Sequence, residues 1–171
     1  MEQIIYDRTQ ADVDYARLNP DSKEYLKGTL NYVDLNRIER NYLELQEKLA
    51  LIGKDTEINP VKTFVTLLYS EMTQNYDYYQ NMTYEELLNE DKWIMTDSIF
   101  IEYINQIRRN VEEIKKAINS NEPIEYTSSL NYKQLNSLEK ILYEATIFVQ
   151  NQMKSFQYAG TFYCGEEMVA Y

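Results

Sequence analysis

A twelve-residue pattern occurs twice in this chain, one hundred positions apart. Residues 29–40 read TLNYVDLNRIER and residues 129–140 read SLNYKQLNSLEK, which match in identity or in side-chain class at most positions. A weaker third copy, YINQIRRN, lies at 103–110. Internal repetition of this kind indicates structural units that fold in the same way.

Each copy begins a run of apolar residues spaced alternately three and four apart, which places one apolar seam along an α-helix. The runs are Leu35, Ile38, Tyr42, Leu45, Leu49 and Ile52; Ile104, Ile107, Val111, Ile114 and Ile118; and Leu135, Leu138, Leu142, Ala145 and Val149, with Phe156 further along. The chain has only 4 Gly and 3 Pro, a scarcity that favours long helices over a many-stranded sheet. We therefore predict an all-α fold, a bundle of three signature helices with additional shorter helices.

Polar residues mark where these helices begin and end. Asn31 and Asn131 stand one turn before the seams, where an Asn side chain can accept from a free backbone N–H, and Asp34 and Gln134 occupy the third position of a capping box. Gly53 follows the first helix and is expected to end it.

An Asn directly follows the first seam residue in all three copies, at Asn36, Asn105 and Asn136. Helix propensity alone would favour Ala, Leu or Glu there. These amides either face a partner or tie each helix to a neighbouring loop, since buried polar groups are hydrogen-bonded. Recurrence on three helices favours the packing interpretation.

The chain reads as a single helical domain over 1–171. The sequence Thr9-x-x-Asp12 resembles a capping box for a short helix through about Leu18, and Asn59-Pro60 and Thr83 each begin a further helix. The expected segments are an arm at 1–6, the first helices at 7–53, a helical insertion at 54–95, the second and third signature helices at 96–156, and an aromatic tail at 157–171.

Both ends are rich in aromatic and β-favouring residues, so short extended or β-like arms are expected there. The candidate partner-binding residues of these arms are Ile4, Ile5, Tyr6, Tyr158, Phe162, Tyr163 and Tyr171. The tail after Phe156 is expected to be non-helical, and residues 4–6 could pair with it. Each arm either folds back on its own bundle or docks on a neighbouring molecule.

The charge and the ends of the sequence limit the partners and the compartment. A net charge of -11 argues against nucleic acid and anionic membrane surfaces. The opening residues lack a signal peptide, and no apolar run is long enough to span a bilayer. Cys164 is the only cysteine, which excludes an internal disulfide. We expect a protein made in the cytoplasm.

The residue types that most enzymes need are missing or unpaired. With no His, His-dependent triads and His-based metal sites are ruled out, and Cys164 has no evident activating partner. Adjacent carboxylates such as Glu112 and Glu113 point in different directions on a helix. The sequence therefore predicts no catalytic residue, no metal site, no cofactor and no enzymatic activity.

Several blocks resemble a known group of proteins. They are Asp7-Arg8-Thr9-Gln10-Ala11-Asp12-Val13, the block from Lys27 to Arg37, Trp93 with Thr96-Asp97, and the ending from Tyr163 to Glu166. In these the chain resembles small helical proteins encoded among tail and baseplate genes of phages and phage-tail-like bacteriocins of low-GC Gram-positive bacteria, while residues 54–90 depart from the pattern.

The resemblance implies a non-enzymatic structural or adaptor subunit of a contractile particle. Its partners would be other tail, baseplate or fibre proteins, with self-association as a further possibility, and contact would run through the termini. The alternative is a soluble assembly chaperone or regulatory protein that binds a tail component transiently.

Overall fold

The fold of the described residues is helical, as predicted. The computed structural model describes residues 1, 3–22, 25–59 and 101–163, and of 157–163 it describes the backbone alone. The helices in these ranges are α1 (Gln10–Leu18), α2 (Tyr32–Leu51), α6 (Ile101–Ile118) and α7 (Tyr132–Tyr163), and the same ranges contain no strand. The helices predicted to begin at Pro60 and Thr83 lie outside the described residues.

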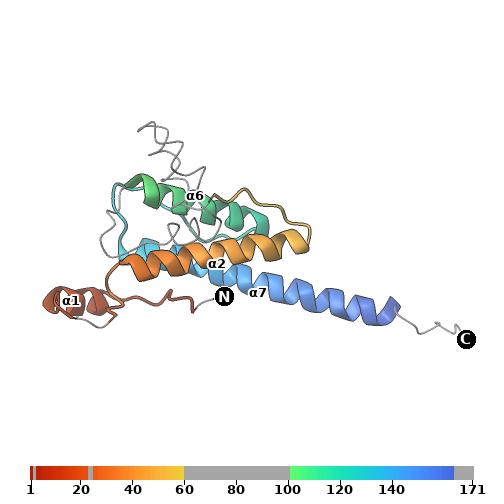
Figure 1. The fold of residues 1–171 in the computed structure, drawn as a ribbon, viewed down its shortest axis with the longest axis horizontal. Helices are drawn as coiled ribbons and strands as arrows, with labels where there is room; N and C mark the ends of the chain where they lie inside the picture. The colour runs from red at the N-terminus through yellow and green to blue at the C-terminus, as the bar shows by residue number, and fades with distance from the viewer. Residues whose placement is uncertain (2, 23–24, 60–100, 164–171) are drawn as a thin grey trace, which may run out of the picture.

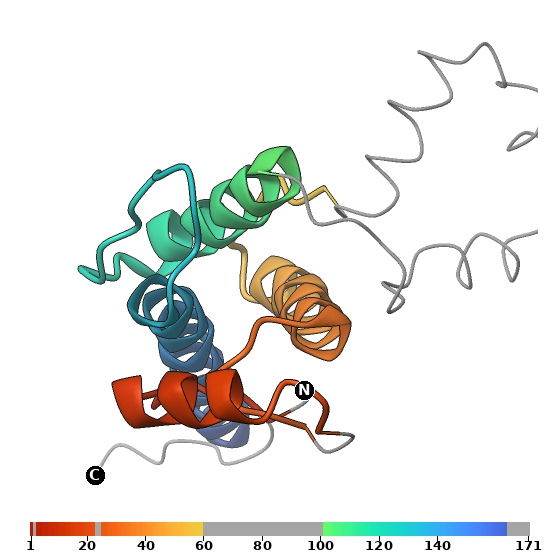
Figure 2. The same cartoon turned by 90° about the vertical axis from the view of Figure 1, so that its left-hand side faces the viewer.

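The three signature helices form a parallel bundle in which each contacts the other two (Figure 1). All three begin at the same end: Arg37 near the start of α2 reaches Glu139 near the start of α7, and Arg108 in α6 reaches the Ser129 carbonyl just before α7. Viewed along the bundle, α2, α6 and α7 stand at the corners of a triangle, and α1 lies across the starting end (Figure 2).

The predicted seams meet in one core. All the predicted seam residues from Leu35 to Leu49, Ile104 to Ile114 and Leu135 to Val149 are buried in a single apolar cluster, with Ile52 and Ile118 partly buried at its edge. A strict alternation of three and four residues repeats every seven, which is the spacing found in coiled-coil helices. The bundle therefore resembles a three-stranded coiled coil made by a single chain.

Parallel helices need connections that return to the starting end, and here these connections are extended and lie in the grooves of the bundle. The segment 119–130 returns between α6 and α7, and the segment 54–59 leaves the end of α2 between α2 and α6. The arm at 3–9 lies between α2 and α7. Residues 54–59 are therefore extended, and the prediction of a helical insertion from residue 54 is wrong for them.

Helix ends follow the predicted capping residues. Thr9 caps α1 and Asn31 caps α2, each in a reciprocal capping box with Asp12 and Asp34 respectively. Before α7, the Asn131 side chain likewise accepts from the backbone N–H of Gln134, and the backbone N–H of Asn131 donates to the Gln134 side chain. These three capping boxes satisfy backbone donors that would otherwise lack partners.

Two of the core helices stop in the same way, and α7 does not. Gly53 ends α2 with φ of 75°, and Asn119 ends α6 with φ of 56°. After α2 the N–H of Lys54 donates to the Leu49 carbonyl at 2.9 Å, the six-residue ring of a Schellman motif. The repeat places Met153 where α2 has Gly53, so α7 has no stop residue at that point.

The helix α7 consequently continues to Tyr163, and the prediction of a non-helical tail is wrong for residues 157–163. Gly160 lies inside this helix, where it costs about 1 kcal/mol of helix stability relative to Ala but does not end it. The remaining tail residues, with Tyr171 and Cys164, lie outside the described residues. Residues 4–6 do not pair as strands with residues 157–163, because 157–163 are helical.

Candidate functional site

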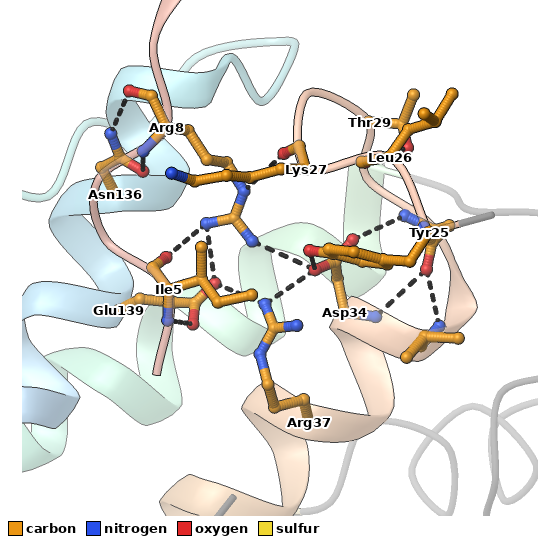
Figure 3. A network of polar contacts seen from close by, with 12 residues as sticks. Ile5, Arg8, Tyr25, Leu26, Lys27, Thr29, Asp34, Arg37, Asn136 and Glu139 are labelled. Carbon is orange, nitrogen blue, oxygen red and sulfur yellow. Dashed lines mark hydrogen bonds and ion pairs between the residues drawn. The ribbon is translucent and has the colours of Figure 1, made fainter. Parts of the chain in front are cut away.

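The most elaborate polar arrangement in the described chain is a buried cluster of four charges at the starting end of the bundle (Figure 3). Arg8 pairs with Asp34 at 3.0 Å and with Glu139 at 2.8 Å. Arg37 pairs with the same two carboxylates at 2.7 and 2.8 Å. The side chains of Asp34 and Glu139 are 0% exposed, so two cations and two anions balance each other away from water.

The two members on α2 are placed by local structure. Asp34 is the capping-box residue of α2, and Arg37 lies one turn later on the same face. Burial alone would lower the pKa of Arg37, but its hydrogen bond and ion pair with Glu139, together with the charge of Asp34, raise that pKa above its usual value. Burial and the hydrogen bond to Asp34 raise the pKa of Tyr25. The pairing keeps Arg37 charged and Tyr25 neutral.

The cluster fastens two segments to the bundle. Glu139 accepts from the backbone N–H of Ile5 at 2.8 Å, and Arg8 donates to the carbonyls of Ile5 and Lys27. The hydroxyl of Tyr25 donates to Asp34 at 2.8 Å. Because the charges cancel and bind backbone groups, the arrangement fits a structural fastening better than a reactive centre.

The arm that carries Ile4, Ile5 and Tyr6 is folded back on its own bundle. Ile4 packs against the core cluster, and the Tyr6 ring lies 5.0 Å from the ring of Tyr143 in α7. Of the two alternatives for this arm, the described structure shows the folded-back one. Whether its exposed Tyr6 also contacts a partner stays a prediction.

One signature amide binds an extended segment directly, and a second does so through an arginine. Asn136 accepts from the Arg8 N–H at 3.1 Å and donates to the Arg8 carbonyl at 2.8 Å. Asn105 accepts from Arg108, whose guanidinium donates to the carbonyls of Thr127 and Ser129. Asn36 is half-buried at the same position of α2. For Asn136 the tying interpretation is the observed one, and Asn105 contacts the segment only through Arg108.

Sequence reasoning missed three residues that hold these segments. Arg8 and Arg108 are buried guanidinium groups, and Asn110 clasps the backbone of Asn59 through bonds to its N–H and carbonyl. A signal was available in the repeat, because a charged residue follows the second seam residue in every copy, at Glu39, Arg108 and Glu139. Glu39, Arg108 and Glu139 are all buried.

The predicted C-terminal binding residues lie at the far end of α7. Tyr158, Phe162 and Tyr163 belong to this helix, and their side chains are not described. Just before them, Phe156 has 56% of its surface exposed. In Figure 1 this end of α7 extends well past the ends of α2 and α6.

Two other kinds of feature are not found within the described ranges. No group of three or more acidic or thiol side chains suited to a metal ion occurs there. None of the described helices combines the length and the apolar character needed to cross a bilayer.

No protein-family model, no curated protein and no solved structure matches the chain.

Proposed function

We propose that this protein is a non-enzymatic structural or adaptor subunit of a phage tail or a phage-tail-like particle, positioned at the baseplate or at a fibre attachment. The motif resemblance of residues 7–13 and 27–37 supports the setting. The feature of the fold that carries the adaptor role is the long end of α7.

This end of α7 extends beyond the core of the bundle. By the repeat, residue 151 corresponds to Leu51 at the end of α2, so the twelve residues from 152 to 163 have no counterpart in α2. At 1.5 Å per residue they extend the bundle by about 18 Å. A helix that leaves its own bundle needs some other packing surface, since isolated helices this short are marginal in water.

The seam runs on into this extension. Phe156 lies seven residues after Val149, which is buried, yet Phe156 itself is more than half exposed. Covering the exposed half of such a ring contributes about 1–1.5 kcal/mol, which is the driving force a neighbouring subunit would use. The sequence gives the extension a single charged residue, Lys154, in a chain of net charge -11, so charge repulsion is weakest here.

The test is occupancy in purified particles produced with variant chains. Ser155→Pro breaks α7 beyond residue 151 by removing a helix hydrogen bond and clashing with the preceding turn, and Ser155→Ala at the same exposed position is the matched control. We expect the Pro variant to remain folded in its core but to be lost from particles, and the Ala variant to be incorporated normally. Phe156→Ser tests the apolar contact without breaking the helix.

Quantitative mass spectrometry of the particles decides between the outcomes. Stoichiometric presence of the wild-type chain supports the structural role. Its absence from finished particles together with binding to an unassembled tail component would replace this proposal with the assembly-chaperone alternative. Normal occupancy of the Ser155→Pro variant would remove the role given to α7.

A further inference from the structure

A groove on the bundle forms a second surface, separate from the projecting end of α7. A groove of about 540 Å³ lies where α6 ends, between the first residues of the returning segment and the outer side of α7. Its apolar lining includes Ile118, Phe148 and Ile147, and Ile147 is 39% exposed. This groove lies beside the projecting helical end of α7, and the inference drawn from it does not depend on the proposed function.

The groove continues the channel between α6 and α7 that already holds an extended segment. Residues 120–130 run along that channel, fastened by Ser120 to Glu144 of α7 at 2.6 Å and by Arg108 of α6 to the Thr127 carbonyl at 2.9 Å. The groove opens at the end of the channel where this segment starts. A second extended segment entering there would continue the same line along α7.

The bundle clasps extended backbone with side-chain amides, and the groove offers two amides that are free to do so. Asn136 bonds both the N–H and the carbonyl of Arg8, and Asn110 does the same to Asn59. Asn121 and Asn151 line the groove, and neither side chain has a hydrogen-bond partner in the part of the chain that the structure describes.

The charge of the groove selects a basic occupant. Its one cation, Lys140, is already paired with Glu122 at 2.6 Å. Glu144 accepts from Ser120, a neutral hydroxyl, and Lys140 is also the cation that interacts with Glu144, so the groove has two carboxylates and one cation. In a chain of net charge -11, a second copy would bring like charge to this face, whereas a segment with Lys or Arg would bring the opposite charge.

We propose that this groove binds an extended segment of another protein that alternates apolar and basic residues. An apolar side chain of the segment would rest on Ile147 and Phe148, its Lys or Arg would pair with Glu144, and its backbone would bond to Asn151. The recognition combines apolar pockets for alternate side chains with polar contacts to the main chain.

The test uses the full chain and a short fluorescent peptide of alternating lysine and valine, measured by anisotropy, with alternating glutamate and valine as the control peptide. Two substitutions remove one carboxylate each: Glu144→Gln in the groove, which keeps an acceptor for Ser120, and Glu113→Gln, a matched control on the exposed side of α6. Thermal unfolding checks that every variant is folded.

We expect the lysine peptide to bind the wild-type chain and the glutamate peptide to bind at least about tenfold more weakly. Glu144→Gln and Ile147→Ser should each weaken binding about fivefold to tenfold, while Glu113→Gln stays within about twofold; tenfold corresponds to 1.4 kcal/mol. Amide chemical shifts should change at 118–122 and 140–151.

Three results would overturn the inference. Equal weakening by Glu144→Gln and Glu113→Gln would mean diffuse attraction to an acidic surface. Self-association of the wild-type chain that Ile147→Ser abolishes in sedimentation would make a second copy the occupant. A gain in peptide affinity on deleting residues 164–171 would assign the groove to the chain's own end.

Discussion

Replacing Arg8 tests whether the buried charge cluster holds the fold together. Arg8→Met keeps much of the aliphatic length but removes one of two cations from a site where both carboxylates are fully buried. Asp34 and Glu139 would then share Arg37 alone, which leaves a net buried negative charge. Breaking a buried pair from one side costs about 3–5 kcal/mol, much of it the desolvation of the unpaired charge.

The expected loss is large compared with the stability of a typical domain. A loss of about 4 kcal/mol is a substantial part of the usual 5–15 kcal/mol. With a urea m-value of about 2 kcal/mol/M, the unfolding midpoint should fall by about 2 M. The measurement is urea unfolding followed by far-UV circular dichroism at neutral pH, with Arg109→Met as a control, since Arg109 is exposed and should change stability by about 0.5 kcal/mol or less.

A double variant separates charge imbalance from lost packing. Arg8→Met with Glu139→Gln returns the cluster to neutrality, because one cation and one anion remain. If charge causes the loss, the double variant should be about 1–3 kcal/mol more stable than the sum of the two single effects. The reasoning is refuted if Arg8→Met costs less than about 1 kcal/mol or if the two effects simply add.

Three further predictions concern the backbone and the caps. Gly28→Ala would bring a Cβ within 2.1 Å of a backbone oxygen of α1, so α1 must shift at a cost of about 1–3 kcal/mol. Gly53→Ala meets no atom and costs about 1 kcal/mol through its φ of 75° alone. Urea unfolding of the two variants compares these costs. Asn31→Ala and Asn131→Ala should each cost about 1 kcal/mol and add in the double variant, and a non-additive result in the same assay would argue against independent caps. The hydroxyl and the backbone N–H of Thr9 hold the pKa of Asp12 below its usual 3.8, so the Asp12 carboxylate stabilises the fold above that pH. This stabilisation is lost as the pH falls through the lower pKa of the folded state. Asp12→Asn should therefore flatten the fall in urea midpoint between about pH 5 and pH 3, and an unchanged slope would contradict this linkage.

The seams and the caps could be predicted because they are local. A spacing of three and four residues, from Leu35 to Leu49 for example, identifies a helix face without reference to the rest of the chain. Capping residues act within four positions, so the roles of Asn31 and Gly53 as helix ends could also be predicted. What the spacing does not contain is the relative direction of the helices.

That direction decides the polar contacts, which is why they were missed. Arg8 and Glu139 are far apart in sequence, and they meet only because α2 and α7 run parallel and the arm returns between them. The end of α7 was misjudged for a different reason. Aromatic residues and Gly160 resemble an extended tail, but the repeat itself, with Met153 in place of Gly53, already indicated a helix that does not stop.

Equivalent positions of the repeat keep the same structural role even where the residue type differs. The position after the second seam residue holds Glu139 in α7 and Arg108 in α6, which have opposite charges. Glu139 accepts from the backbone N–H of Ile5, while Arg108 donates to the backbone carbonyls of Thr127 and Ser129. An extended segment presents both donors and acceptors, so either charge can fasten one beside a helix. The signature thus specifies a helix with an extended segment lying along it.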